Sequence, residues 1–150
     1  MRGGFIHNLI LVDHIAKKAS LFGASLDREA SIKIGEKILF GDLLIEIGSQ
    51  KILVEAEMSS KRIANDLLKG AAFEVTELWI VVPNPRVARS VRQKLSQMSI
   101  MPRRNGLFVF SLPQALQRFE HLIELISLPN VEMEMKRKSE KIIMKGQYNG

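Results

Sequence analysis

The spacing of hydrophobic positions changes along the chain, and each change marks a predicted element. Over residues 5–22, Leu9, Val12, Ala16 and Ala19 recur at helical spacing, which predicts an amphipathic helix. Shorter apolar runs with alternating polar positions follow and predict three strands. These strands span residues 30–40 (with a kink at Gly35), 42–47 and 51–58.

The second half of the chain alternates between helical and strand patterns. Residues 59–73 predict a helix that Ser59 or Ser60 can cap, and residues 85–98 predict another that begins at Pro85. Two continuous apolar runs are typical of strands covered on both faces. These runs, and a last predicted helix, span residues 77–83, 106–111 and 112–127.

This order of elements predicts an α/β fold with a mixed five-stranded sheet flanked by helices. Short connections join the first three strands, so we expect an antiparallel meander. The last two strands are joined through a helix and should run parallel by a right-handed crossover. We expect one domain over residues 1–128 and a charged C-terminal tail, residues 129–150, part of which is ordered only on a partner or not at all.

Composition narrows the function classes. The 150 residues include no cysteine, so disulfides and thiolate metal sites are excluded. No apolar run approaches the ~18 residues of a membrane span, and we expect a cytoplasmic protein without membrane contact. The net charge of +6 favours a polyanionic partner, most often nucleic acid.

The segment KILVEAEMSSK, residues 51–61, places two glutamates in a strand-like run. A primed turn with Gly48-Ser49 at its centre would set Ile47 opposite Gln50, so that paired positions sum to 97. Glu46 then faces Lys51, and Asp42 faces Glu55. Strand alternation adds Glu57 to the same side, so three acids converge at the end of the hairpin away from its turn.

Like charges that face each other across strands repel. They are tolerated if a divalent cation lies between them or if a raised pKa lets them share a proton. Hard oxygen ligands suit Mg²⁺ or Mn²⁺. The alternative is a solvated strand end, in which exposed acids are balanced by Lys61 and Arg62.

The pieces GDLLIEI, ILVEAEMSSKR and LWIVVP, together with the order of the elements, resemble the PD-(D/E)XK nuclease superfamily. The resemblance covers roughly residues 5–127 and implies a restriction-endonuclease-like fold. Within the superfamily, the E-x-E pattern followed by Ser and Lys, and the early HNLILVDHI, are similar to plasmid mobilisation and replication-relaxation proteins.

The resemblance implies that Asp42 and Glu55 bind the metal ion of an enzyme that hydrolyses phosphodiester bonds in DNA. The lysine that the superfamily places two residues after this glutamate is absent, because Glu57 occupies its position. Some members supply the lysine from the following helix, where Lys61 stands. If Lys61 does not reach the site, Glu57 is an additional ligand or the mark of an inactive site. Glu29, just before the first strand, is either a further ligand or a surface acid.

Basic residues recur after the fourth strand and suggest phosphate contacts without sequence readout. They are Arg86, Arg89, Arg92, Arg103 and Arg104. A solvated helix face is the alternative interpretation.

Three hypotheses remain open on the sequence. The chain is a metal-dependent DNA endonuclease, with a homodimer expected if both strands are cut. Alternatively, it is an inactive nuclease-fold protein that binds DNA or assists plasmid mobilisation, or an interaction domain with surface acids. RNA is not excluded as the partner.

Overall fold

The computed structural model describes the backbone of residues 2–127 and the side chains from Asn8 onward. Three helices and five strands have defined bounds: α1 (Arg2–Leu21), β1 (Ser25–Ile34), β2 (Lys37–Ile47), β3 (Gln50–Ala56), α2 (Ile63–Ala72), β4 (Glu77–Val81), α3 (Pro85–Gln97) and β5 (Leu107–Phe110). Residues 112–127 are also helical. The α/β class is therefore confirmed.

The five strands form one mixed sheet in the order β1-β2-β3-β4-β5. The first three strands are antiparallel, whereas β3 pairs parallel with β4 and β4 pairs parallel with β5. The predicted meander and the predicted parallel crossover are both confirmed. Helices connect β3 to β4 and β4 to β5, so the central strands are covered by helices. Their sequences are therefore continuous apolar runs.

The predicted β2–β3 register is confirmed. Ile47 pairs with Gln50 and Glu46 with Lys51, and the pairing continues to Leu43 and Val54. Gly48 has a φ of 57°, which a glycine adopts without steric cost at the first central position of a primed turn. A local turn signal therefore sets the register of the whole hairpin.

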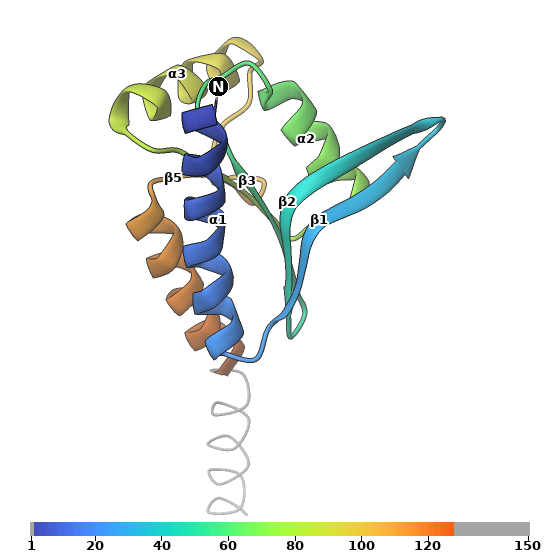
Figure 1. Ribbon diagram of the computed structural model, residues 1–150, viewed down its shortest axis with the longest axis vertical. Helices are drawn as coiled ribbons and strands as arrows, with labels where there is room; N and C mark the ends of the chain where they lie inside the picture. Colours follow the sequence, from blue (N-terminus) through green and yellow to red (C-terminus); the bar gives the residue numbers. More distant parts are fainter. Residues whose placement is uncertain (1, 128–150) are drawn as a thin grey trace, which may run out of the picture. The chain divides into compact units, whose positions relative to one another are not determined.

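The predicted strand 30–40 is wrong in its extent, and the predicted order of elements is not matched in every detail. Ile34 pairs with Lys37, and Gly35 has a φ of 60°, so these residues form a turn between β1 and β2. Ile32, Ile34 and Ile38 lie even numbers of residues apart across the turn, so the hydrophobic pattern does not indicate that the chain reverses there. Figure 1 shows the resulting hairpin extending as an arm, residues 31–40, beyond the body of the sheet.

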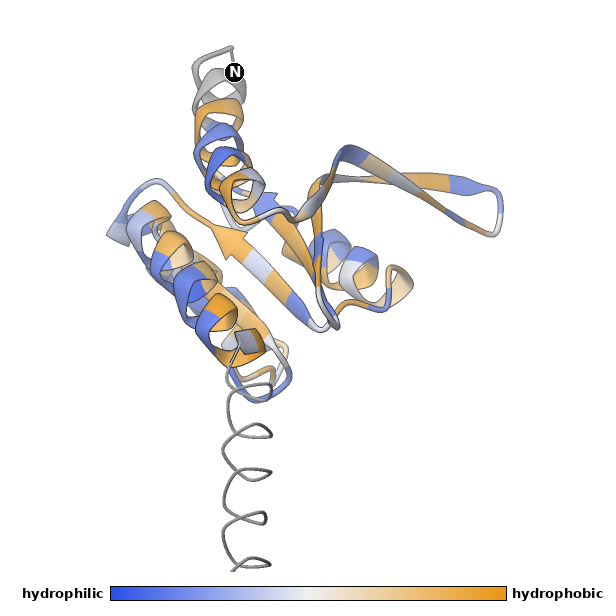
Figure 2. Cartoon of the chain, turned by 90° about the horizontal axis from the view of Figure 1, so that it is seen from below, coloured by the Kyte–Doolittle hydropathy of each residue, from blue (hydrophilic) through white to orange (hydrophobic). Residues whose placement is uncertain are grey.

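Helices cover the sheet on both faces. Helix α1 contacts β1, β2 and β3, while α2 contacts β1, β2 and β4 and α3 contacts β5. The predicted apolar face of α1 is confirmed at Val12, Ala16 and Ala19, whereas Leu9 is exposed. Hydrophobic residues concentrate on the central strands, and the helices carry both kinds of residue (Figure 2).

The core beneath α2 and α3 shows why these helices pack where they do. Leu53, Ile63, Leu78, Ile80 and Leu95 belong to one buried cluster in which the two helices meet β3 and β4. Helix α3 starts where Asn84 accepts a hydrogen bond from the Val87 amide, with Pro85 in the first turn, as predicted.

The chain divides into two compact units, Met1–Gln117 and Arg118–Gly150. The first unit contains the whole sheet and helices α1 to α3. The predicted C-terminal tail, residues 129–150, lies outside the described residues. Across residues 2–127, no helix has both the length and the apolar character needed to cross a membrane.

Candidate metal centre

The carboxyl end of β3 brings two of the predicted acids together. Asp42 is next in register after the last ladder pair, Leu43 with Val54, and its Oδ2 accepts a hydrogen bond from the Ala56 amide at 2.8 Å. The Asp42 charge raises the pKa of Glu55, and the two side chains share a hydrogen bond. The expectation that positions 42 and 55 lie beside each other across the hairpin is therefore confirmed.

Gly41 makes this close approach possible. A Cβ atom built at position 41 would lie 2.5 Å from Leu53 Cδ1 and 3.3 Å from Glu55 Oε1. The first distance is shorter than any carbon–carbon packing contact. A side chain at this position would therefore force the buried Leu53 side chain to shift and would crowd the Glu55 carboxylate.

Glu57 follows β3 directly and is also buried, with 7% of its surface exposed. Its backbone amide donates a hydrogen bond to the Val81 carbonyl at 2.9 Å, which holds the chain against the end of β4. The side chain therefore stays near Glu55, although residue 57 lies outside the ladder.

Helix α2 adds an acid and a lysine that the sequence analysis missed. Asp66 is fully buried, and Lys69 Nζ lies 3.6 Å from Glu55 Oε2 and 3.8 Å from Asp66 Oδ1. A signal was present in the sequence, because Asp66 stands on the buried row of α2 between Ile63 and Gly70. An acid on the apolar row of an amphipathic helix needs a partner.

Glu55, Glu57 and Asp66 each offer a carboxylate oxygen, and these oxygens lie within 4.8 Å of one another. Opposite oxygen ligands are about 4.2 Å apart around Mg²⁺ and up to ~5 Å apart around Ca²⁺. Adjacent oxygen ligands around Mg²⁺ are only ~3 Å apart, so the three side chains would have to draw closer together to share one divalent cation. Asp42, a predicted metal ligand, lies beside this triad but is not part of it.

Several buried oxygens of the triad have no hydrogen-bond partner among the described residues. They are Glu55 Oε1 and both carboxylate oxygens of Asp66. An unpaired buried polar atom costs roughly 1–3 kcal/mol, and more if the group is charged. A bound cation would compensate buried carboxylate oxygens of this kind, so the chemistry of the residues present fits a hard metal ion.

Burial and crowding raise the pKa values of the three acids. Burial, with repulsion from Asp42 second, raises the pKa of Glu55 from 4.5 to about 9. Burial likewise raises the pKa of Glu57 to about 7, and burial with the Glu57 charge raises that of Asp66 to about 8. Lys69 opposes all three shifts without cancelling them. Near neutral pH, the centre without metal therefore holds protons that a divalent cation would displace.

The structure does not bring Lys61 to the acids. Helix α2 begins at Ile63, so the predicted helix start at residue 59 is wrong, and Lys61 is exposed in the preceding turn. The second helical turn carries Lys69 to Glu55 instead. This difference follows from the later start of the helix.

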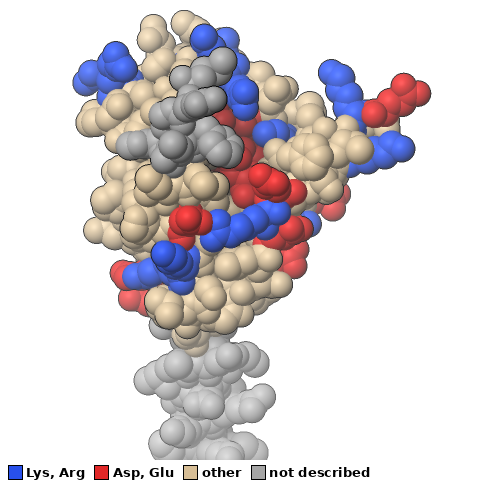
Figure 3. Space-filling view, in the orientation of Figure 1, with Lys and Arg blue, Asp and Glu red and all other residues tan. Residues whose placement is uncertain are grey.

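A cleft of about 730 Å³ opens beside the acids, and Figure 3 shows acidic side chains in the hollow between α1 and the arm. Glu55, Glu57 and Lys69 line the cleft, as do Arg62 and Glu29. Glu29 lies within β1 and not before it as predicted. Its φ is 52°, and the β1–β2 register places it opposite Asp42.

The predicted arginine set lies elsewhere in the fold. Arg86, Arg89 and Arg92 are on the exposed side of α3, and Arg103 and Arg104 are exposed in the turn before β5. Among the described residues that line the acidic cleft, none belongs to this set. Any role in phosphate binding would therefore concern a second part of the surface.

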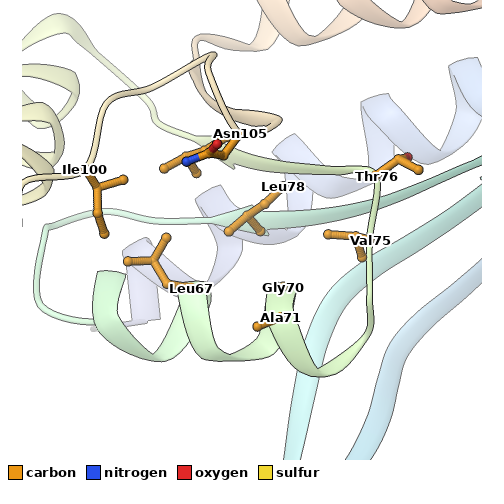
Figure 4. Close-up of a pocket in the computed structure, with 9 residues that line it drawn as sticks. Leu67, Gly70, Ala71, Val75, Thr76, Leu78, Ile100 and Asn105 are labelled. Atoms are coloured by element: carbon orange, nitrogen blue, oxygen red, sulfur yellow. The ribbon is translucent and has the colours of Figure 1, made fainter.

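A smaller hollow of about 300 Å³ lies along a different side of α2 (Figure 4). Leu67, Val75, Leu78 and Ile100 line it, and none of its lining residues is charged. The hollow therefore offers no charged side chain that could bind a metal ion or a phosphate.

No protein-family model and no curated protein matches the chain. The geometry of the acidic cleft is therefore the basis for assigning a function.

Proposed function

We propose that the chain is a metal-dependent nuclease with a restriction-endonuclease-like fold that hydrolyses phosphodiester bonds in DNA. The observation that carries this proposal is the triad of Glu55, Glu57 and Asp66, in which buried carboxylate oxygens lack partners. The three antiparallel strands, the following helix and the parallel fourth strand support the fold.

The carboxylates would hold Mg²⁺ or Mn²⁺ through Glu55, Glu57 and Asp66. When bound, such an ion lowers the pKa of a coordinated water and polarises a phosphate oxygen. Asp42 accepts a hydrogen bond from the Ala56 amide, and this bond holds the Asp42 carboxylate beside Glu55. Asp42 thereby keeps the Glu55 side chain in place.

Lys69 takes the role that the sequence resemblance implied for Lys61. Its ammonium lies beside Glu55 and Asp66 with 15% of the side chain exposed. From this position it can orient the attacking water and stabilise the negative charge that develops on the phosphate. The open side of the cleft leaves room for a phosphodiester backbone.

A second candidate function is nucleic-acid binding without cleavage, as an accessory protein. Glu57 stands where the resemblance expects a lysine, and the exposure of Lys61 favours this alternative. The position of Lys69 against the carboxylates argues for catalysis.

Cleavage of supercoiled plasmid DNA in Mg²⁺ or Mn²⁺ tests the proposal. We expect nicked or linear product from the wild type and a loss of at least 100-fold in Asp66→Asn and Glu55→Gln. The control, Glu46→Gln, removes an exposed acid at the other end of β2 and should cut normally.

Thermal melting with Mn²⁺ separates the two candidate functions. A metal-dependent rise in melting temperature without cleavage of DNA or RNA would support the accessory role. Absence of both the rise and cleavage would refute the metal centre.

A further inference from the structure

The arm exposes two large apolar side chains on one side. Ile38 and Phe40 are 56% and 57% exposed, and they lie two residues apart on β2, so they share a face. Their partners across the hairpin are Lys33 and Ser31. The other face carries Ile32, which packs against the core. We call Ile38 and Phe40 the arm ridge.

The arm ridge leads directly into the acidic cleft. Phe40 lines the cleft, and Asp42 follows two residues later on the same strand. Two residues of strand span roughly 7 Å, whereas successive nucleotides of a strand are ~3.4 Å apart along a duplex. For a nucleic-acid strand that follows β2, a base against Phe40 would therefore lie about two nucleotides from the point where the cleft reaches Asp42 and the neighbouring triad, and a base against Ile38 about four.

The surroundings of the ridge favour a polyanion as the occupant. Lys33 and Lys37 outnumber the one exposed acid of the arm, Glu36, and Arg62 is exposed at the cleft. Apolar side chains of this kind wedge between bases, and aromatic rings stack on them.

A second copy of the chain fits the ridge less well. A fully buried aromatic side chain covers 150–250 Å². The two ridge side chains, already partly covered, would add roughly 200–300 Å², whereas a stable interface needs about 800 Å² from each partner.

We propose that the arm is a nucleic-acid-binding element in which Phe40 and Ile38 pack against bases two to four nucleotides from the scissile bond. Lys33 and Lys37 contact the adjoining phosphates. The inference rests on the proposed function for the location of the scissile bond, but the contact with bases is measurable without cleavage.

Fluorescence anisotropy with a labelled DNA duplex and its single strand, in Ca²⁺ and at several salt concentrations, tests the contact. Phe40→Ala should weaken binding roughly tenfold or more with little change in salt dependence, because the lost contact is not ionic. The pair Lys33→Gln with Lys37→Gln should reduce the salt slope by about two. Met101→Ala, which removes an equally exposed side chain before β5, is the matched control.

A fluorescent adenine analogue, 2-aminopurine, locates the contact. Placed two to four nucleotides from the cleavage position, it should brighten as it unstacks on the wild type and stay dark with Phe40→Ala. Because both ridge residues are exposed, the variants should keep the wild-type melting temperature, and Ile38→Ala supplies an independent second test.

The outcomes separate this inference from the proposed function. Loss of binding in the arm variants, with no cleavage by the wild type in Mg²⁺ or Mn²⁺, would support the arm and refute the nuclease. Equal binding and cleavage by wild type and Phe40→Ala would refute the arm and leave the nuclease standing. A wild-type homodimer that dissociates in Phe40→Ala would assign the ridge to a second copy and overturn the inference.

Discussion

Replacement of Asp66 by asparagine should remove a large part of the pH dependence of folding stability in the metal-free protein. Asp66 is fully buried, both of its carboxylate oxygens lack hydrogen-bond partners among the described residues, and burial raises its pKa from 3.8 to about 8. The folded protein therefore holds a proton that the unfolded chain releases at much lower pH. Stability from this group is present at low pH and is lost as the pH rises towards 8.

The size of the effect follows from the difference between the two pKa values of Asp66, 3.8 in the unfolded chain and about 8 in the folded protein. Each pH unit between the two pKa values lowers the free energy of unfolding by about 1.4 kcal/mol. Close to pH 8 the folded protein also begins to release this proton. Asp66 therefore lowers the free energy of unfolding by about 2 kcal/mol between pH 6 and pH 8. The asparagine variant lacks this loss and should gain about 2 kcal/mol on the wild type over the interval.

Urea unfolding in EDTA at pH 6 and pH 8 measures this difference. The fluorescence of Trp79, which is the single tryptophan and is buried, reports unfolding. Asp27→Asn, which removes an exposed carboxylate from β1, is the matched control and should keep the wild-type pH profile. If the free energies of unfolding of Asp66→Asn and the wild type differ by the same amount at pH 6 and at pH 8, the buried, protonated state of Asp66 is refuted.

Four further results are expected. Mn²⁺ should bind more tightly at pH 8 than at pH 6, by about tenfold per pH unit for each proton displaced, and titration calorimetry in two buffers would show the released protons. Lys69→Ala should lower the cleavage rate by 10²–10³ with Lys61→Ala within twofold of wild type, and the reverse result would restore the role predicted for Lys61. Gly41→Ala should destabilise the fold by about 1–3 kcal/mol, because its Cβ meets Leu53, and an unchanged urea midpoint would contradict this. Glu57→Gln should raise metal-free stability at pH 8 and weaken the Mn²⁺-induced rise in melting temperature, and retention of the full rise would exclude Glu57 as a ligand.

Local signals in the sequence determine much of the sheet. The glycine turn at Gly48 specifies which residues pair across β2 and β3, because a two-residue turn leaves one register and a shift by one residue would turn the apolar side chains to the wrong face. The proximity of Asp42 and Glu55 follows from this register. The start of α3 at Pro85 is likewise local, since its cap is formed within four residues.

The extent of the first hairpin, in contrast, is not set by a few neighbouring residues. Ile32, Ile34 and Ile38 keep an even-numbered spacing on both sides of Gly35, so the pattern is compatible both with a kinked strand and with a turn between two strands. Pairing between β1 and β2 decides for the turn, and it thereby produces the arm beside the cleft.

The composition of the acidic centre was decided by tertiary structure. Asp66 and Lys69 reach Glu55 because α2 packs its buried row, with Ile63, onto the sheet, and the helix start at residue 63 sets which lysine faces the acids. Raised pKa values arise in the same way, since removal of a carboxylate from water depends on the elements packed around it and not on its neighbours in sequence. The amino-acid sequence alone thus determined the hairpin and the strand end where acids meet. The packing of a helix against that end determined which groups complete the site and in which protonation state.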